Sequence, residues 1–300
     1  MRAFLFKLGA SSLLALALAF ALTSAAGADT LGPITFESSQ GYVPGDINLQ
    51  PALPGSGSLP NGRWSRLGPY DVNVVPVSDY PAASGYGFGS QALEISDAVT
   101  SGSFGDQTFS PGLADEAGES GAYNAGLSGG LRQPHFDASF MIGTSQASEQ
   151  PGLHMTVSPD RGDGARMSYL RFEDQADGVH VFFVDVVDKG PVPTVATFRE
   201  SEIATLSRTS SHLIQFSIDF KDGAANDTVK IYIDSKLVKN GTTWEDYYRY
   251  DPEQTPQGNK VPTVDKLLFR ESGTAHPSNA LKGFLLDRVI LDSSGVNVRK

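Results

Sequence analysis

The sequence predicts an all-β fold, a single sandwich of two antiparallel sheets, and three observations carry that prediction. Residues 212–220 and 228–234 alternate apolar and polar side chains with a period of two, which is typical of half-buried strands. The turn between them, residues 221–227, is rich in Asp, Asn and Gly, which accept left-handed backbone angles. The chain also contains 32 glycines and 18 prolines and few segments with helical spacing, which favours short strands joined by turns.

The hairpin of residues 212–234 predicts a specific core. Phe216 and Ile218 lie on one face of its first strand, and Val229 and Ile231 lie on the same face of its second strand, because alternate side chains of a strand share a face. Phe284 lies on a later apolar strand that is expected to return to this sheet. We therefore expect these five side chains to share one core.

The N-terminal segment has the order of a secretory signal. Arg2 and Lys7 precede an apolar run over residues 8–22, and small residues at Ala26 and Ala28 suit a signal peptidase. An uncleaved membrane anchor is the alternative, but the run is shorter than the roughly 20 residues that span a bilayer. We expect a signal peptide at residues 1–28, cleavage near Ala28, and a secreted or periplasmic protein. No later segment is apolar enough to span a membrane.

Composition restricts the partners and the domain count. The chain has 23 basic and 34 acidic residues, a net charge of −11, which disfavours nucleic acid and anionic membranes as partners. It contains no cysteine, so an exported chain must be held by its core rather than by disulfides. Residues 29–300 suffice for one β-sandwich domain.

Strand and turn signals alternate along the rest of the chain. Residues 41–64 are predicted as a loop ordered around Trp64, and residues 96–130 as a long loop that carries several carboxylates. One short helix is expected near Glu200 to Ser207, with Ser201 as its N-cap. Outside the hairpin, the expected strands cover residues 31–39, 70–77, 91–95, 135–143, 152–159, 165–174, 178–187, 194–200, 263–272 and 283–291.

Three segments together resemble the concanavalin A-like jelly-roll superfamily, in particular its laminin-G-like modules and related bacterial secreted proteins. They are the first strand, residues 34–38, the hairpin of residues 212–236, and the last strand, residues 283–291, which would return beside the first. Ser235 and Arg288 depart from the pattern of the family. The resemblance implies a jelly-roll sandwich. Since that superfamily contains lectins, binding modules, glycoside hydrolases and polysaccharide lyases, the fold alone does not choose among them.

The densest aromatic and polar cluster outside the strand pattern lies in a predicted loop, residues 243–250. Trp and Tyr rings stack on the apolar faces of sugar rings, while Glu, Asp and Arg form directional hydrogen bonds to hydroxyl groups. The alternative is that the aromatic side chains anchor the loop against the sandwich. As a ligand site, the cluster consists of Trp244, Glu245, Asp246, Tyr247, Tyr248 and Arg249.

Catalysis has weaker support in the sequence. A retaining glycosidase of this fold needs two carboxylates on one face of a strand, and the pairs Glu245–Asp246 and Glu173–Asp174 are adjacent instead. A lyase needs a cation or amide beside a uronate carboxylate and a Tyr or His that moves a proton. Residues of these types are His154, Arg166, Tyr169, Arg171, His180, His212, Tyr232, Tyr247, Tyr248 and Arg249.

Two aspartate-rich turns leave a metal site open. Asp160 with Asp163, and Asp222 with Asp227, present oxygen atoms at the short spacing that calcium requires. The alternative is that these aspartates form the turns themselves, because tight hairpins need the same residues. No cofactor is required by the sequence, and calcium stays an open alternative.

The sequence therefore favours a secreted, non-catalytic carbohydrate-binding or surface-interaction domain, whose partner would be a glycan or another extracellular surface ligand. The first alternative is a carbohydrate-active enzyme of jelly-roll fold, a polysaccharide lyase on an anionic glycan. The second alternative is an extracellular protein with a purely structural role.

Overall fold

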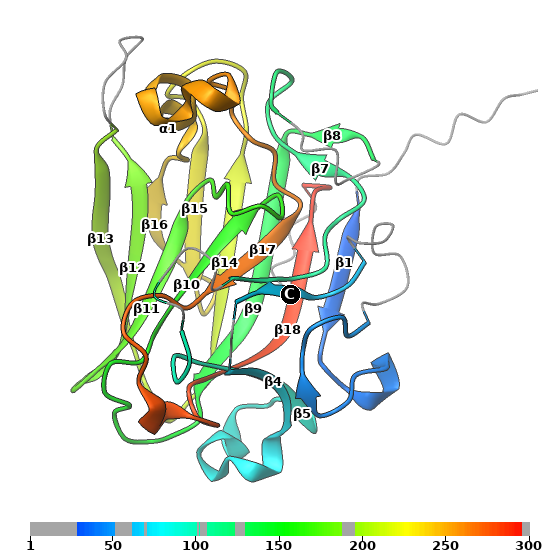
Figure 1. Ribbon diagram of the computed structural model, residues 1–300, viewed down its shortest axis with the longest axis vertical. Helices are drawn as coiled ribbons and strands as arrows, with labels where there is room; N and C mark the ends of the chain where they lie inside the picture. Colours follow the sequence, from blue (N-terminus) through cyan, green and yellow to red (C-terminus); the bar gives the residue numbers. More distant parts are fainter. Residues whose placement is uncertain are drawn as a thin grey trace, which may run out of the picture.

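The computed structural model describes residues 29–51, 62–68, 71–100, 102, 107–123, 130–187 and 196–295. The predicted signal peptide, residues 1–28, lies outside the described residues. Two large antiparallel sheets face each other across a shared hydrophobic core (Figure 1). This is the two-sheet jelly-roll sandwich that the sequence and its concanavalin A-like resemblance predict.

The first sheet has nine strands in the described residues. In spatial order they are β16 (Lys236–Gly241), β15 (Thr228–Ile233), β14 (His212–Asp219), β9 (His135–Thr144), β18 (Phe284–Asp292), β5 (Gln91–Ser96), β4 (Asp71–Pro76) and β2 (Gly45–Asp46), with β1 (Thr30–Ile34) paired to β18.

The second sheet has seven strands in the described part of the chain. In spatial order they are β13 (Phe198–Leu206), β12 (Gly178–Val186), β11 (Tyr169–Gln175), β10 (His154–Asp160), β17 (Lys266–Arg270), β6 (Gln107–Phe109) and β3 (Ser65–Leu67).

Short elements lie between the strands of the two sheets. Two of them, β7 (Glu116–Ala117) and β8 (Arg132–Gln133), form a small parallel pair. The helical elements are η1 (Ser38–Gln40), η2 (Val77–Asp79), η3 (Pro81–Gly85), α1 (Glu245–Tyr250), η4 (Pro252–Gln257) and η5 (Pro277–Asn279). Among the described residues, no helix has the length and apolar character needed to cross a bilayer.

The predicted hairpin forms as β14 and β15, in the register that the alternation requires. Phe216 lies opposite Ile231, and Ile218 lies opposite Val229. These four side chains and Phe284 are buried in the same core cluster, so the predicted core is confirmed. The last strand also returns beside the first, because Leu31 of β1 pairs with Leu291 of β18.

The predicted order around Trp64 is confirmed. Its indole is fully buried, and its Nε1 atom donates a hydrogen bond of 3.0 Å to the hydroxyl of Tyr42. The rings of Phe36 and Phe269 lie 5.6 Å and 6.0 Å from the indole. This aromatic group joins the N-terminal loop to β17 of the second sheet.

The helix predicted for Glu200 to Ser207 is wrong. This segment belongs to the edge strand β13, which pairs with β12 from Phe198 opposite Val186 to Leu206 opposite Val179. Its Ile203 and Thr205 are β-branched and therefore suit a strand, and the hydrogen-bond ladder with β12 outweighs a weak helix cap. The predicted loop over residues 96–130 is also partly wrong, since β6 pairs there with β17 and β3.

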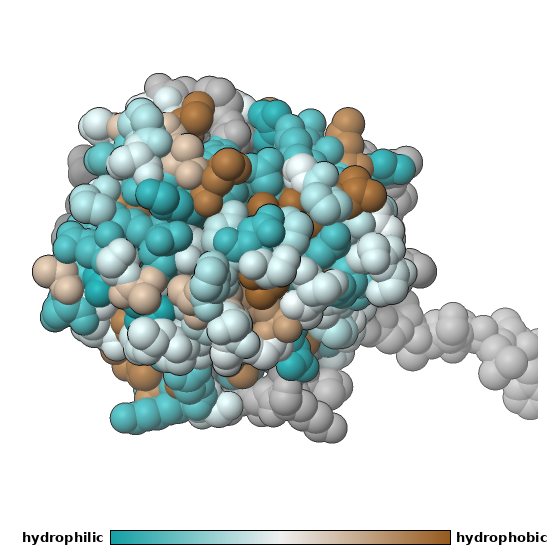
Figure 2. All heavy atoms as spheres, turned by 90° about the horizontal axis from the view of Figure 1, so that it is seen from below, coloured by the Kyte–Doolittle hydropathy of each residue, from teal (hydrophilic) through white to brown (hydrophobic). Residues whose placement is uncertain are grey.

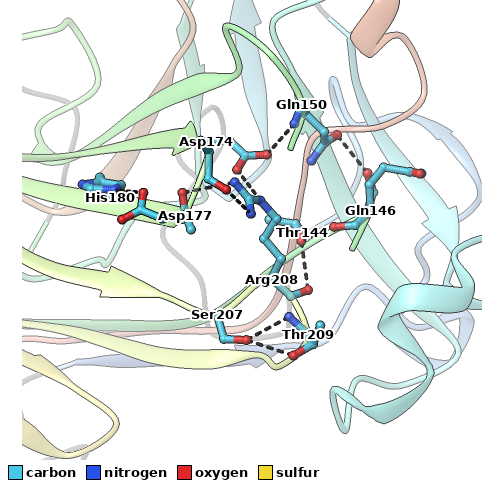
Figure 3. Close-up of polar contacts among 12 residues, drawn as sticks. Thr144, Gln146, Gln150, Asp174, Asp177, His180, Ser207, Arg208 and Thr209 are labelled. Atoms are coloured by element: carbon cyan, nitrogen blue, oxygen red, sulfur yellow. Dashed lines mark hydrogen bonds and ion pairs between the residues drawn. The ribbon is translucent and has the colours of Figure 1, made fainter. Parts of the chain in front are cut away.

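A buried ion pair lies between the two sheets near the start of β12 (Figure 3). Arg208, which precedes β14 of the first sheet, donates from Nε to Asp174 of β11 across 2.6 Å. The other carboxylate oxygen of Asp174 accepts the backbone N–H of Gln150 at 2.9 Å. The carbonyl of Arg208 accepts hydrogen bonds from the hydroxyls of Thr144 and Tyr86. These contacts attach the two sheets to each other.

The two ends of the sandwich differ in character. Helix α1 lies at the upper end in Figure 1, where Trp244, the residue before the helix, bonds to Val184 near the end of β12. The opposite end, shown in Figure 2, has hydrophilic residues interspersed with small hydrophobic spots and no broad hydrophobic area among the described residues. The aromatic residues of the segment 243–250 thus lie at the end that carries α1.

Candidate functional site

Residues 245–250, predicted as part of a loop, form the helix α1. Thr243 accepts the N–H of Glu245 on its hydroxyl at 3.2 Å, and the N–H of Tyr248 reaches the carbonyl of Trp244 at 3.2 Å. Glu245 and Asp246 lie in the first turn, where a negative charge favours the helix N-terminus. The expectation of a loop is therefore wrong, because local capping and packing of the aromatic residues favour one helical turn and a half.

Trp244 and Tyr248 anchor this helix in the main core. Trp244 is 8% exposed and donates from Nε1 to the carbonyl of Val184 at 3.0 Å, while Tyr248 is 6% exposed and donates to the carbonyl of Arg166 at 2.9 Å. Both side chains also border a cavity beside the helix. Most of the surface of both side chains is therefore used to anchor the helix, as the alternative interpretation predicts. A ligand could contact only the small part of each ring that faces the cavity.

The cavity beside α1 has a volume of about 710 Å³, and we call it the aromatic pocket. Its aromatic side chains outnumber every other class, and its cations outnumber its acids by four to two. The aromatic residues are Tyr123, Tyr169, Phe198, Trp244, Tyr247 and Tyr248; the cations are Arg161, Arg166, Lys260 and Arg270; the acids are Asp163 and Glu253.

The floor of the aromatic pocket is the outer face of the second sheet. Leu170 and Phe172 of β11 and Phe269 of β17 are buried in the core. Because side chains alternate along a strand, Tyr169 and Arg270 face outward and into the pocket. The pocket therefore lies on the sheet rather than in the core, and it is open to solvent along one side.

Two arginines of the loop between β10 and β11 form one wall. The guanidinium of Arg161 lies 4.5 Å from the centre of the Tyr123 ring and donates to Asp163 at 2.8 Å. The guanidinium of Arg166 lies 5.3 Å and 6.0 Å from the ring centres of Tyr169 and Trp244. Cations over aromatic faces hold both the charges and the rings in place.

The phenols of Tyr169 and Tyr247 are protonated at neutral pH. Burial raises the pKa of Tyr169. Burial, followed by the nearby carboxylate of Glu253, raises the pKa of Tyr247 to about 12. Tyr247 donates to Glu253 at 3.1 Å and accepts from Gln254 at 2.7 Å. These hydroxyls are therefore hydrogen-bond donors and not ready bases.

The predicted lyase residues are brought together only in part. Arg166, Tyr169, Tyr247 and Tyr248 meet in the aromatic pocket. The other predicted residues of this set, which lie outside the pocket, are His154, Arg171, His180, His212, Tyr232 and Arg249. Within the described residues, all five histidines of the chain contact a carboxylate instead: His135 and Asp219, His154 and Asp97, His180 and Glu202, His212 and Asp234, His276 and Asp97.

Several residues of the pocket were not predicted from the sequence. Arg270 could have been found, because the alternation of residues 263–272 places it on the polar face of that strand. Phe198 could have been found as an edge-strand side chain. Tyr123, Arg161 and Lys260 lie outside regular strands, where no periodicity indicates which way a side chain points.

Glu245 and Asp246 line a different cavity, on the other side of α1. This acidic pocket has a volume of about 380 Å³ and also contains Asp227, Asp185 and Arg199. Glu245 accepts the backbone N–H groups of residues 226 and 227 at 2.7 Å and 2.8 Å. The structure therefore divides the predicted ligand set, with the acids of α1 in the acidic pocket and its tyrosines in the aromatic pocket.

Arg249 joins neither pocket. It pairs with Glu119 and lies 3.6 Å from Glu245, and it also donates to the carbonyl of Gly223 at 2.8 Å. These contacts attach α1 to the turn between β14 and β15. Arg249 is therefore positioned to hold the helix, and it has no direct access to the aromatic pocket.

Two carboxyls of the acidic pocket have raised pKa values. Burial, and then the charge of Asp227, raises the pKa of Glu245 to about 7. Burial is also the main cause that raises the pKa of Asp227 to about 6. An acid whose pKa is raised on folding holds its proton more tightly in the folded state than in the unfolded chain.

We expect Glu245→Gln to weaken the pH dependence of stability. The pKa of Glu245 rises from its ordinary value of 4.5 to about 7 on folding. Between these values the unfolded chain is the more ionised state, so the free energy of unfolding falls as pH rises through this window. Glutamine keeps an acceptor oxygen and cannot ionise. Urea denaturation across the window should give a flatter curve for this variant, whereas the exposed control Glu149→Gln should keep the wild-type slope; an unchanged slope in Glu245→Gln would contradict the assignment.

The predicted calcium ligands are engaged in turns. Asp160 accepts the backbone N–H groups of Asp163 and Gly164 at 3.1 Å and 3.2 Å, and Asp163 pairs with Arg161. Asp222 accepts the N–H of residue 120 at 2.7 Å, and Asp227 accepts the N–H of residue 221 at 2.8 Å. In the described ranges, no three His, Asp or Glu side chains are grouped so that they could hold a metal ion. The turn-forming alternative accounts for the contacts of Asp160, Asp163 and Asp227, whereas Asp222 contacts the distant residue 120; calcium binding stays an open alternative.

No family model and no curated protein sequence matches this chain. Among solved structures, it is similar to an alginate lyase in complex with an alginate tetrasaccharide, with a TM-score of 0.47, 9% identity, and coverage of 87% of this chain and 96% of that one. It is also similar to an endo-β-1,4-glucuronan lyase from the fungus Trichoderma reesei, with a TM-score of 0.39, 16% identity, and coverage of 80% and 94%. The catalytic domain of a glycoside hydrolase family 131 protein from Coprinopsis cinerea gives a TM-score of 0.41, 13% identity, and coverage of 90% and 98%. These likenesses concern the arrangement of strands, and they carry no residue's role over to this chain.

Proposed function

We propose that this protein binds an acidic polysaccharide in the aromatic pocket. The observation that carries the proposal is the composition of that pocket, in which six aromatic side chains and four cations surround only two acids. The whole chain has a net charge of −11, so a cluster of cations at one open site is a local reversal of sign. Such a reversal favours an anionic ligand at this site over the rest of the surface.

The pocket has the two kinds of surface that a glycan needs. The Phe198 and Tyr123 side chains are 44% and 41% exposed, so they can stack on the apolar faces of sugar rings. The guanidinium groups of Arg161 and Arg166 and the ammonium of Lys260 can bind the carboxylates of uronate residues. The open side over the second sheet would let a chain of sugars extend beyond the pocket.

A lyase on the same polysaccharide is the second candidate, and the proximity of Tyr169 to Arg166 favours it. In such a reaction a base removes the proton at C5 of a uronate, the electron pair forms the C4–C5 double bond, the C4–O bond breaks, and an acid protonates the departing oxygen. Tyr169 could supply that proton, and Arg166 could stabilise the carboxylate. Burial raises the pKa of Tyr169, so its hydroxyl is suited to give a proton rather than to take one. Binding needs only the rings and cations of the pocket, and we therefore propose it first.

We expect Phe198→Ala and Tyr123→Ala each to weaken binding of an oligouronate by about tenfold or more, on the usual behaviour of aromatic contacts at a binding site. Isothermal titration calorimetry measures the affinity, and Leu237→Ala is the matched control, because Leu237 is 42% exposed on β16 of the other sheet. Wild-type affinity in both aromatic variants would contradict the proposal, and the absence of any glycan ligand would favour a structural role. Ultraviolet absorbance of the new double bond in the same samples tests the lyase.

A further inference from the structure

We propose that Arg166 receives the carboxylate of the bound sugar and thereby makes the site select acidic over neutral glycans. This inference rests on the proposed function and goes further, because it assigns the selectivity to one of the four cations of the aromatic pocket. It commits to a planar carboxylate as the recognised group. Three features of Arg166 support it: its burial, its lack of an acidic partner, and its aromatic neighbours in the pocket.

The side chain of Arg166 is mostly buried, and no described acid pairs with it. The residue is 5% exposed, yet within the described part of the chain its side chain forms no ion pair and no hydrogen bond. The side chains of Arg161 and Arg208 are also largely buried, but each forms an ion pair with an acid, Arg161 with Asp163 and Arg208 with Asp174. Burying an arginine without an opposite charge costs free energy. A group kept in that state is suited to an anion that arrives with the ligand.

Asp160, a buried acid at the end of β10, does not supply that anion. It is fully buried and is attracted by the charge of Arg166, but no ion pair joins the two side chains in the described residues. The Oδ1 atom of Asp160 instead accepts the backbone N–H groups of residues 163 and 164, at 3.1 Å and 3.2 Å. Asp160 therefore shapes the turn that carries Arg166, and it leaves the guanidinium unpaired.

Aromatic rings lie beside the guanidinium of Arg166. The rings of Tyr169 and Trp244 lie 5.3 Å and 6.0 Å from the central carbon of the guanidinium. Both rings and the guanidinium border the aromatic pocket. Rings do not use up the N–H groups of a guanidinium as an acid would, and two parallel N–H groups match the two oxygens of a carboxylate. A single hydroxyl of a neutral sugar does not offer such a pair of oxygens.

Two other cations of the pocket, Arg161 and Lys260, are less suited to this role. Arg161 already donates to Asp163 at 2.8 Å and to the carbonyl of Tyr123 at 3.2 Å. Lys260 is exposed, so water competes for its ammonium group. These residues add to the positive field of the site, whereas Arg166 supplies a fixed geometry.

The test is a comparison of two probes on three proteins. The probes are an oligouronate and the same oligosaccharide after its carboxyl groups have been reduced to primary alcohols. The proteins are wild type, Arg166→Gln, and the control Arg288→Gln, whose arginine is exposed on β18 of the other sheet. We expect wild type and the control to prefer the oligouronate by about 10- to 100-fold in Kd, and Arg166→Gln to lose that preference while it binds the reduced probe as wild type does.

Arg166→Lys separates charge from geometry and keeps the test decisive if Arg166→Gln folds poorly. Lysine preserves the charge without the fork, so we expect it to retain only a small part of the preference. Full preference for the oligouronate in either Arg166 variant, or equal affinity of wild type for both probes, would overturn the role of Arg166 and leave glycan binding in place. Failure of wild type to bind either probe would instead overturn the proposed function.

Discussion

Arg208→Ala should lower the free energy of unfolding by about 3 to 5 kcal/mol, because it leaves a buried carboxylate without its partner. The Asp174 side chain is fully buried and that of Arg208 is 11% exposed, with 2.6 Å between Nε and the carboxylate oxygen. The N–H of Gln150 would still donate to Asp174, but one backbone donor does not replace a guanidinium. The pair also attaches the two sheets to each other, so the loss should appear in cooperative unfolding of the whole sandwich, measured by urea denaturation.

The exposed ion pair between Arg66 and Asp46 provides the matched control. Its two atoms are also 2.6 Å apart, but the side chains are 27% and 49% exposed. Arg66→Ala should therefore cost no more than about 1 kcal/mol. The double variant Arg208→Gln with Asp174→Asn should be more stable than the sum of its single variants predicts, since no charge is left unpaired. Equal losses in Arg208→Ala and Arg66→Ala would show that the buried pair is not important for stability.

Phe216→Ala should also lower the free energy of unfolding by about 3 to 5 kcal/mol, through the loss of buried apolar surface and the cavity that remains. Phe216 is fully buried in the interior of the first sheet, where β14 pairs with both β9 and β15. Close packing on the inner face leaves its neighbours little freedom to fill the space. Calorimetry or urea denaturation gives the value.

The same substitution at Phe198 is the control for that prediction. Phe198 is 44% exposed at the edge of the second sheet and contacts the rings of Trp244 and Tyr247 from outside. Phe198→Ala should cost about 1 kcal/mol, from its aromatic contacts alone. A loss in Phe216→Ala as small as that in Phe198→Ala would mean that the register of the hairpin is wrong.

The strands that could be predicted are those whose burial differs between their two faces. In β14 and β15 the inner face is fully apolar, so a period of two reveals both the strand and its core positions. In β13 most side chains are exposed or half-buried, because the strand lies at an edge, and its sequence shows no such contrast. There a Ser followed by good helix formers imitates the start of a helix. This segment forms a strand because it pairs with β12. That pairing joins residues that are distant in the sequence, so a local sequence pattern cannot predict it.

Local sequence patterns predict even less of the candidate site than of the fold. The cluster at residues 244–249 was found because aromatic and charged residues are adjacent in the sequence. Its division between two pockets follows from the helix α1, which places Tyr247 and Glu245 on different sides. The partners of Tyr247 in the aromatic pocket include residues that are distant in the sequence, such as Phe198 of β13 and Arg166 of the loop before β11. Only the folded chain brings those charges and rings together.

The position of β18 has a consequence for how this chain can reach its native state. The last strand lies between β9 and β5, and it also pairs with β1, so it fills the middle of the first sheet rather than an edge. Until residues 284–292 are available, the two halves of that sheet have no common neighbour to hydrogen-bond to. During synthesis from the N-terminus, the two halves of the sheet therefore cannot join until residues 284–292 have been made. Loss of these residues would remove the centre of the sheet and not merely its edge.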